Sequence, residues 1–413
     1  MTKIDELIQE LCPDGVETFP LEECCNILDK KRKPVTKNSR EKGEYPYYGA
    51  NGVQDYVSDY IFNGKFVLVG EDGSVITKSG TPVVTWAEGK IWVNNHAHVI
   101  EEKSGTMLRY LYFYIQTIDV TSLIHGNIPK LTGRDFRSLK IALPPLEIQR
   151  EIVSILDNFT NLTAELTAEL TARKTQYGYY RDKLLEVETD IHKYTLGEIA
   201  TVTKLAGFEF TNYVTYSERG NIIALRGLNV KNGKLDLSDV KYIDKSDFSK
   251  LERSKLHIGD MLFTYVGTVG QVAIVDEEDK YYLAPNVALI RFDKKILLPQ
   301  YMKYYFQTTQ FWDKQIRRLL QSSSMQNIPM EKIRKFEIIV PPFDVQNRIV
   351  NVLDNFEKIC SDLNIGLPAE IEARQKQYEY YRDKLLTFAE TGNTILSRAE
   401  QSRAEQSRAE QSR

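Results

Sequence analysis

Two stretches of the chain place a hydrophobic side chain at nearly every third or fourth position. The first stretch carries Ile152, Leu156, Phe159, Leu162, Leu166, Leu170, Tyr177, Tyr180 and Leu184. This spacing is that of an α-helix with one apolar stripe, and it predicts a single helix of about 40 residues, roughly 60 Å long. The second stretch carries Ile349, Leu353, Phe356, Leu363, Ile371, Tyr378, Tyr381 and Leu385. A helix with one apolar stripe needs a partner, so we expect the two stretches to pack on each other as a coiled coil.

The two helical stretches are copies of one another. Residues 144–159 are matched by residues 341–356, and the heptapeptide Tyr-Tyr-Arg-Asp-Lys-Leu-Leu at 179–185 returns unchanged at 380–386. Only the second copy contains Gly366-Leu367-Pro368, which predicts a kink or break there. The repeat predicts equivalent structures related by a pseudo-symmetry axis, with antiparallel helices and a domain at each end of the pair.

Short β-branched and aromatic runs, bounded by Gly, Asn and Asp, fill the chain outside these helices. Residues 65–69, 90–93, 221–225 and 271–275 have the pattern of strands, and residues 107–116 and 300–320 have that of helices. We therefore predict an α+β fold, in which two pseudo-symmetric α/β domains are separated by two long antiparallel helices that form a coiled coil. The expected divisions are an N-terminal arm (1–20), a first domain (21–143), a first helix (144–188), a second domain (189–340), a second helix (341–390) and a repetitive tail (391–413).

The composition of the 413 residues, 42% of them hydrophobic, indicates a globular protein with more than one core. No apolar run is long enough to span a bilayer, and the first residues do not resemble a signal peptide, so we expect the chain in the cytoplasm. The cysteines at 12, 24, 25 and 360 are too few and too badly spaced for a disulfide framework or a tetrahedral metal site, and His96 with His98 does not complete one. We expect reduced, buried cysteines and no metal.

The charge is uneven along the chain. A net charge of −3 and a pI near 6.1 argue weakly against a nucleic-acid partner. This total conceals two basic regions, one with Lys30, Lys31, Arg32, Lys33, Lys37, Arg40 and Lys42, and another with Arg317, Arg318, Lys332, Arg334 and Lys335. A solvated face is the competing interpretation of such runs.

Motifs that would indicate catalysis are incomplete in this sequence. Amino-group methyltransferases need Asn or Asp before Pro-Pro-aromatic, and the nearest match, at 340–343, begins with Val340. Gly64-Lys65 and Gly89-Lys90 lack the upstream glycine and the following Ser or Thr of a phosphate-binding loop. We expect no catalytic centre, and an acidic cluster at Glu71 and Asp72 leaves a free-standing nuclease as a minor alternative.

The helical stretches match closely, whereas the domains between them differ almost throughout. This contrast suggests that the two domains bind two different ligands and are held in one common geometry. The signatures at residues 143–149, 155–159 and 176–185 resemble those of the specificity subunit of type I restriction-modification systems, and the resemblance covers residues 1–390. It implies that each domain is a target recognition domain for one half of a split, asymmetric site in double-stranded DNA. It further implies that the helices set the distance between the halves.

The resemblance also implies partners. They are two methyltransferase subunits, which carry S-adenosylmethionine and methylate adenine, and optionally restriction and translocase subunits, which use ATP and Mg²⁺. The chain itself would then be a non-catalytic subunit without a cofactor of its own. A coiled-coil adaptor with two protein-binding heads is the alternative.

Residues that read base edges are Asn, Gln, Arg, Lys, Ser and Thr, and basic groups contact phosphates. The candidate DNA-binding residues are Lys30, Lys31, Arg32, Lys33, Tyr48, Asn51, Lys78, Asn94, Asn127, Arg226, Asn229, Tyr265, Thr268, Gln271, Asn286, Gln321 and Ser322. Ordinary turns use many of the same residue types, so this competing interpretation stays open for each position. The candidates for packing between the long helices are Leu156, Phe159, Leu166, Leu170, Tyr180, Leu353, Phe356 and Tyr381.

Two short repeats lie within the larger one. Residues 162–165 and 166–169 repeat Leu-Thr-Ala-Glu, and adding or removing one such unit would move the downstream residues by about 6 Å and turn them by roughly 40°. The tail repeats Ser-Arg-Ala-Glu-Gln from Ser397, Ser402 and Ser407, which predicts disorder or a frayed helix. The DNA repeat AGCAG encodes this pentapeptide in every reading frame, so we hypothesise a slippage-prone tract that causes phase variation. A plain solubilising tail is the competing view.

Overall fold

The computed structural model describes residues 3–73, 75–124, 128–186, 193–320, 326–361 and 365–388, and the structural statements concern these residues. The chain divides into two compact units, one formed by residues 1–166 with 371–413 and the other by residues 167–370. The repetitive tail, at 391–413, lies outside the described residues. Each unit has hydrophobic clusters of its own.

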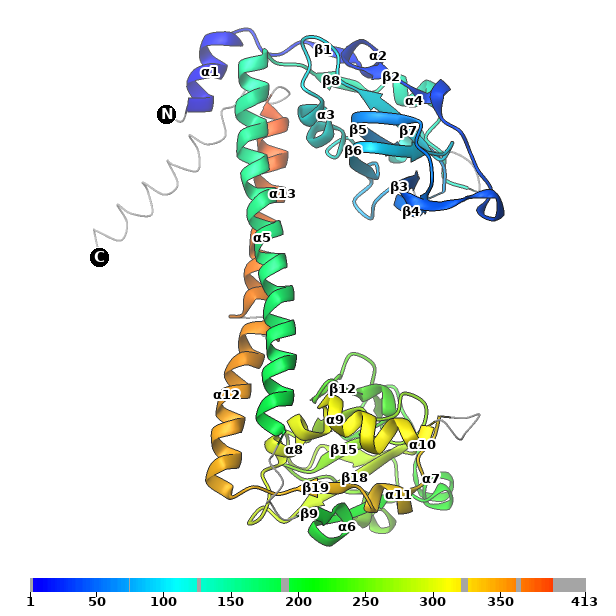
Figure 1. The fold of residues 1–413 in the computed structure, drawn as a ribbon, viewed down its shortest axis with the longest axis vertical. Coiled ribbons are helices and arrows are strands. Elements are labelled where there is room, and N and C mark those ends of the chain that lie inside the picture. The colour runs from blue at the N-terminus through cyan, green and yellow to red at the C-terminus, as the bar shows by residue number, and fades with distance from the viewer. Residues whose placement is uncertain are drawn as a thin grey trace, which may run out of the picture. The chain divides into compact units, whose positions relative to one another are not determined.

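A mixed sheet forms the body of the first unit (Figure 1). Its strands follow the order β2-β7-β5-β6-β3-β4, with bounds Asn26–Ile27, Ala97–Glu101, Phe62–Gly70, Val84–Val93, Lys42–Gly49 and Gly52–Val57. Strands β5 and β6 pair antiparallel with Phe62 opposite Ile91, whereas β3 runs parallel to β6 with Tyr47 opposite Trp92. The predicted strands at 65–69 and 90–93 lie within β5 and β6.

Four short α-helices complete the described part of the first unit. They are α1 (Lys3–Leu11), α2 (Leu21–Cys24), α3 (Leu108–Ile115) and α4 (Gly133–Arg137), and the strand pair β1 (Thr18–Pro20) and β8 (Lys140–Ala142) runs beside them. Buried side chains of the sheet, such as Val67, share one core with Phe113 of α3 and with Ile152 and Leu156 of the first long helix. This core fixes the domain to its helix, because removing the contact would expose the apolar faces of both.

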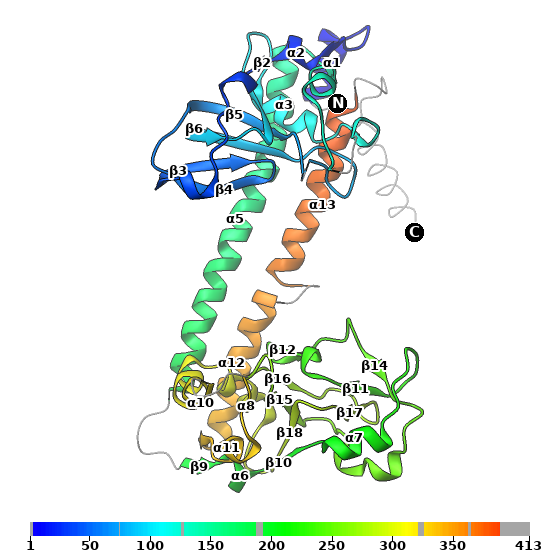
Figure 2. The ribbon, with the colours of Figure 1, turned by 90° about the vertical axis from the view of Figure 1, so that its right-hand side faces the viewer.

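The second unit is built from smaller sheets (Figure 2). One sheet has the order β10-β18-β15-β16, with bounds Ala200–Lys204, Val287–Phe292, Met261–Thr264 and Val272–Ile274. A second has the order β14-β11-β17, with bounds Lys241–Tyr242, Ile223–Leu225 and Tyr281–Leu283. Strand pairs β12-β13 and β9-β19 have bounds Val230–Lys231, Lys234–Leu235, Lys193–Thr195 and Glu337–Ile339. The two domains therefore differ in sheet topology, as the divergence of their sequences predicts.

Short helices complete the second unit. They are α6 (Leu196–Ile199), α7 (Gly207–Tyr213), α8 (Pro299–Phe306), α9 (Thr309–Phe311), a π-helix (Trp312–Arg317), α10 (Arg318–Leu320) and α11 (Met330–Arg334). The single helix predicted at 300–320 is thus divided. Thr308 begins a new helix, because its hydroxyl donates to Tyr305 O at 2.8 Å and accepts from Phe311 N at 3.2 Å, as an N-cap does.

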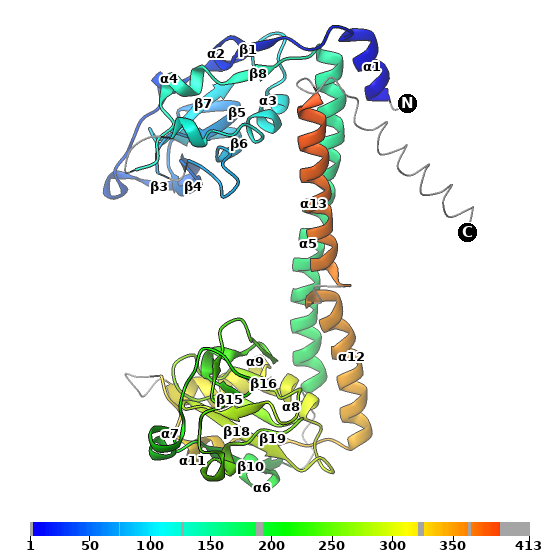
Figure 3. The same ribbon diagram turned by 180° about the vertical axis from the view of Figure 1, so that it is seen from behind.

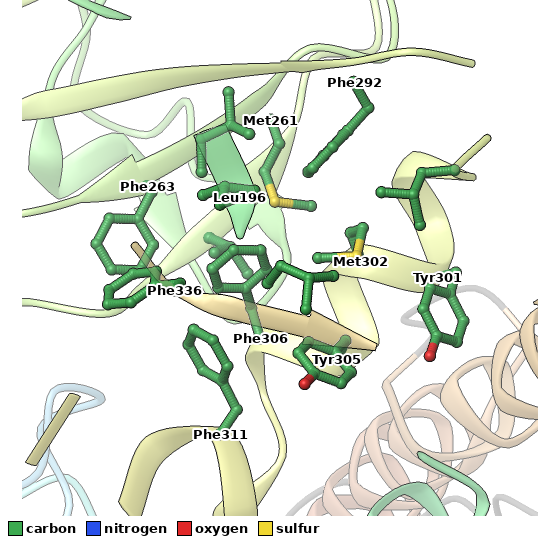
Figure 4. Close-up of a cluster of buried hydrophobic side chains, with 14 of the residues drawn as sticks. Leu196, Met261, Phe263, Phe292, Tyr301, Met302, Tyr305, Phe306, Phe311 and Phe336 are labelled. Atoms are coloured by element: carbon green, nitrogen blue, oxygen red, sulfur yellow. The ribbon is translucent and has the colours of Figure 1, made fainter. Parts of the chain in front are cut away.

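Aromatic rings dominate the core of the second unit (Figure 4). Four phenylalanine rings pack against one another there, those of Phe263, Phe306, Phe311 and Phe336. The ring centroids of Phe306 and Phe311 are 4.6 Å apart, and those of Phe311 and Phe336 are 5.3 Å apart. Edge-to-face packing of this kind is favoured beyond the burial of area alone. The core extends to Leu353 and to the partly buried Tyr177 on the long helices, so this domain too is fixed to the helices that flank it.

The long helices are α5 (Leu146–Leu185), α12 (Phe343–Ser361) and α13 (Leu367–Leu386). Helix α5 is one continuous element, as its periodicity predicts. The second copy is broken, because α12 ends at Ser361 and α13 begins at Leu367, with Pro368 in its first turn where a missing N–H is tolerated. The break predicted from Gly366-Leu367-Pro368 is confirmed.

Each unit contains its own pairing of long helices. In the first, α13 runs antiparallel to the first half of α5, and the Phe159 and Tyr381 rings stack with centroids 5.3 Å apart (Figures 1 and 3). In the second, α12 runs antiparallel to the second half of α5, and Tyr180 meets Phe356 at 5.8 Å. Leu156 and Leu353 are fully buried, whereas Leu166 and Leu170 are half-buried.

The same local frame occurs in both units. In the first, the buried Gln149 accepts from Met107 N and donates to the carbonyl oxygens of Gly105 and Pro144. In the second, the buried Gln346 accepts from Leu298 N and donates to Ile296 and Pro341. A buried amide is stable only when it is satisfied, and these two glutamines are satisfied in the same way. The repeat in the sequence is therefore also a repeat in the structure.

The cysteines are free thiols, and Cys24, Cys25 and Cys360 are buried as predicted, whereas Cys12 is half-buried. Among the described residues, no helix is both long and apolar enough to cross a membrane.

Candidate nucleic-acid interface

Several candidates of the first unit gather at one end of its sheet. Strands β3 and β6 are parallel, so their carboxyl ends meet at the same edge. The turn with Asn51 follows β3, and Asn94 follows β6 and donates through its backbone N–H to Tyr48 O at 3.0 Å. Lys33 reaches the same edge, because its backbone N–H donates to Val93 O at 3.2 Å and its carbonyl accepts from Trp92 Nε1 at 2.7 Å.

The members of this edge differ in exposure. Asn94 is buried, and its amide accepts from His96 N at 2.8 Å and donates to Gln54 Oε1 at 3.3 Å. Tyr48 is also buried, and burial raises the pKa of its hydroxyl. These two residues shape the edge, whereas the side chains of Asn51 and Lys33 are exposed on it and open to a ligand.

An ion-pair cluster holds the basic loop in place. The Arg32 guanidinium lies 2.6 Å from Glu71 and donates to Ala97 O at 2.7 Å, while His98 Nδ1 lies 2.7 Å from Asp29. Burial by itself would raise the pKa of Asp29, but the hydrogen bond and charge of His98, with the charge of Arg32, outweigh it and hold that pKa below its ordinary range. Arg32 is thus occupied within the domain, and Lys30, Lys31 and Lys33 beside it are exposed.

The same cluster could in principle bind a metal ion, because Asp29, Glu71 and His98 bring their ligand atoms within 4.8 Å of one another. The Arg32 guanidinium already supplies the positive charge that these carboxylates need. Both nitrogens of His98 also face oxygen acceptors, Asp29 on one side and Leu131 O at 3.1 Å on the other. Both ring nitrogens of His98 are therefore already engaged within the domain.

Two further candidates of the first unit remain, and the structure describes one of them. Lys78 is exposed in the loop between β5 and β6. Asn127 lies outside the described residues. Lys78 therefore does not lie at the edge formed by β3 and β6.

In the second unit, Asn229 and Arg226 organise one turn. Asn229 is fully buried, and its amide nitrogen donates to Asp236 O and Asp239 O at 2.8 Å, while its oxygen accepts from Arg226 N at 3.0 Å. The Arg226 guanidinium donates through Nη2 to Asp239 at 2.9 Å. Asn229 therefore supports the turn from beneath, and Arg226 remains at its surface.

Three of the candidates line one cleft. Arg226, Thr268 and Asn286, from three separate loops, surround a cavity of about 450 Å³. Phe210, Tyr216 and Leu228 add aromatic and apolar walls. The sequence analysis did not single out Phe210 and Tyr216. Phe210 also packs against a hydrophobic cluster of this unit, and Tyr216 is 39% exposed, so residue type alone did not mark them as part of a cleft.

Other candidates of the second unit lie apart from this cleft. Gln271 lines a smaller cavity of about 290 Å³ together with Arg181, Arg317 and Trp312, and its side chain accepts from Asn232 N at 3.0 Å. Tyr265 is half-buried, and burial raises the pKa of its hydroxyl. Gln321 and Ser322 lie outside the described residues.

Solved structures with the same fold come from type I restriction-modification systems. The S subunit of a type I restriction-modification system from M. genitalium superposes with a TM-score of 0.54 at 13% identity, covering 90% of this chain and 97% of that one. A chain from a study of complex assembly and conformational transition in the type I R-M system gives 0.58 at 14% identity, covering 91% and 98%. The fold is that of the specificity subunits of type I systems.

Sequence comparison gives the family. The model described as "Type I restriction modification DNA specificity domain" matches residues 13–173 and again residues 188–373. A putative type I restriction enzyme specificity subunit of Haemophilus influenzae is 36% identical over 385 residues, covering 91% of this chain and 96% of that protein. The EcoR124I/EcoR124II specificity subunit of Escherichia coli is 34% identical over 302 residues, covering 70% and 72%. The chain belongs to the type I restriction-modification DNA specificity family.

Proposed function

We propose that this chain reads a bipartite, asymmetric DNA site, with one half bound by each domain, and that it positions adenine methyltransferase subunits on that DNA. The main support for the proposal is that the two units share an internal framework but expose different polar surfaces. The buried glutamines and the long helices are the same in both units, whereas the polar edge of the first unit and the cleft of the second are different. A common frame with unlike surfaces suits a protein that holds two unlike half-sites.

The repeated heptapeptide supports two copies of one partner. In the first copy, Tyr179 is 60% exposed and meets Tyr180 at 5.4 Å, with Lys183 Nζ 5.7 Å from its ring. In the second, Tyr380 is 52% exposed and meets Tyr381 at 5.5 Å, with Lys384 Nζ 5.9 Å from its ring.

Large exposed aromatic side chains are characteristic anchors of protein interfaces. Two identical anchors suit two identical methyltransferase subunits, each docked on one copy of the heptapeptide. In this proposal those subunits carry S-adenosylmethionine and the catalytic groups, and restriction and translocase subunits with ATP and Mg²⁺ join optionally. The chain acts in the cytoplasm and catalyses nothing itself.

Methylome sequencing tests the proposal. Cells that express the chain with its methyltransferase subunit should show adenine methylation at one split sequence, and deletion of the gene should remove methylation from that sequence alone. The purified complex should bind this duplex more tightly than a scrambled one, and both affinities should fall as salt rises, because phosphate contacts release counterions.

A methylome that is unchanged by the deletion, together with equal affinity for target and scrambled duplexes, would contradict the proposal. It would favour an adaptor whose two heads bind proteins.

A further inference from the structure

The cleft of the second unit has the walls of a site for a flat, aromatic ligand. Its volume of about 450 Å³ falls within the range of about 300–1,000 Å³ that is common for small-molecule sites. Phe210, on α7, and Tyr216 form an edge-to-face pair on one side, with centroids 5.6 Å apart and planes at 63°. Such rings offer a stacking face to a planar ligand.

Polar groups with free hydrogen-bonding capacity lie on the same cleft. The Arg226 Nε atom is buried and has no hydrogen-bond partner among the described residues. Asn286 and Thr268 line the same cleft and are exposed, so their side chains are accessible to a ligand. A buried donor without a partner is costly, and a bound ligand that accepts from it removes that cost.

The backbone holds one of these groups in an uncommon conformation. Asn286 has a φ of 70°, in the left-handed region that non-glycine residues seldom occupy. Asparagine tolerates this region better than most residues, and the conformation is often found at binding sites. The amide of Asn286 is also the side-chain group that pairs with two adjacent positions on an adenine edge.

The concave shape of the cleft limits which form of a DNA base can reach these polar groups. The base edges of an intact duplex lie at the floor of a groove, where a protruding helix or ribbon reaches them. A cleft walled by rings cannot reach that floor, but it can receive a base that has swung out of the stack.

We propose that this cleft binds one unstacked nucleobase of the DNA site, which stacks on Tyr216 and hydrogen-bonds to Asn286 and Arg226. This inference rests on the proposed function, because it presumes that the domain binds DNA. The base concerned differs from the adenine that is methylated, since methyltransferases extrude their own target into their own pocket.

Fluorescent base analogues test the inference on the complex of this chain with its methyltransferase subunits. A set of target duplexes carries a single 2-aminopurine or pyrrolocytosine at successive positions of both half-sites, leaving the methylated adenine unchanged. Fluorescence of such analogues rises when the base leaves the stack. We expect a several-fold rise at one position on binding.

Variants assign that rise to the cleft. Tyr216→Ala should abolish the rise and weaken binding of the target about tenfold, since base stacking on one ring is worth roughly this factor. Phe208→Ala is the matched control, because Phe208 lies on the same helix as Phe210, is 63% exposed and does not line the cleft. Asn286→Gly keeps the left-handed backbone and removes the amide, so it should relax the preference for one base at the responding position.

Two results would overturn the inference. One is specific, salt-dependent binding in which the fluorescence rises at none of the labelled positions. This result would reject the cleft as a site for an unstacked base and would leave the proposed function intact. A rise that persists in Tyr216→Ala would place the unstacked base elsewhere. Tyr216 is 39% exposed, so its truncation should leave the fold intact, and assembly of the complex checks this for each variant. Absence of specific binding in the unaltered complex would reject the proposed function itself.

Discussion

At the scale of single residues, a largely buried ion-pair cluster holds part of the first unit together. Asp29, Arg32, Glu71 and His98 come from a loop and from strand ends far apart in the sequence, and together they anchor the loop that carries the exposed lysines. Removing one partner from a buried ion pair is strongly destabilising, because the remaining charges lose their compensation. The position of the basic loop therefore depends on Asp29, which contacts His98 and the backbone of Val99 within the domain.

We expect Asp29→Asn to destabilise the first unit by about 3 kcal/mol at pH 7. The folded pKa of Asp29 is depressed, so its ionised carboxylate contributes stability above its unfolded pKa of about 4, and that contribution is lost as the pH falls through the folded value. The difference between the two proteins should therefore narrow below about pH 4. Urea unfolding at a series of pH values measures the free energy of unfolding of both proteins. Asp59→Asn, at an exposed position, should change little, and an equal loss in both variants would contradict the prediction.

The surroundings of single candidate residues could not be predicted from the sequence. Arg32 was expected to contact DNA, and nothing local in the sequence places it 2.6 Å from Glu71. Asn229 and Asn94 were candidates because asparagine can read base edges, yet each is buried and satisfied within its own domain. Whether a polar residue serves the fold or a ligand depends on partners from distant segments, and residue type alone does not encode them.

At the scale of elements, periodicity and repetition carry most of the prediction. The stripe of apolar residues predicts α5 as one helix, and Gly366 with Pro368 predicts the break before α13. The division of residues 299–320 into α8, α9, a π-helix and α10 was not foreseen, because it depends on the hydroxyl of Thr308 and on the aromatic core beneath it. The strand order within the sheets likewise follows from long-range packing.

Deleting residues 166–169 tests whether α5 acts as a ruler. The deletion removes one Leu-Thr-Ala-Glu unit, shortens the helix by about 6 Å and turns its ends by roughly 40° relative to each other. We expect methylation to move to a site whose unread spacer is shorter by about two base pairs, since one base pair occupies about 3.4 Å. Methylome sequencing of the deletion strain gives the spacer directly.

A length-preserving variant controls for changes in composition within the same segment. Thr167→Ala with Glu169→Gln keeps the helix length and should leave the spacer unchanged. If the deletion strain still methylates the site with the original spacer, the hypothesis that the length of α5 sets the spacer is rejected.

At the scale of the whole molecule, the two copies of the heptapeptide should act independently. Tyr179 and Tyr380 each belong to their own unit and are exposed, so truncating one should not disturb the fold or the other copy. We expect Tyr179→Ala or Tyr380→Ala to weaken one methyltransferase contact by about 2 kcal/mol, or roughly 30-fold, as an aromatic interface anchor does. Each single variant should then retain one methyltransferase subunit at concentrations where the unaltered chain binds two, and the double variant should retain neither.

Native mass spectrometry of the co-expressed proteins counts the bound subunits. Tyr56→Ala, at a 55% exposed tyrosine of the first domain, is the matched control and should keep both. Loss of both subunits from a single variant would mean that the two contacts are coupled, because independent sites lose their partners one at a time. Full occupancy in the double variant would place the methyltransferase contacts on another surface, and the exposed tyrosines of the repeat would then need a different partner.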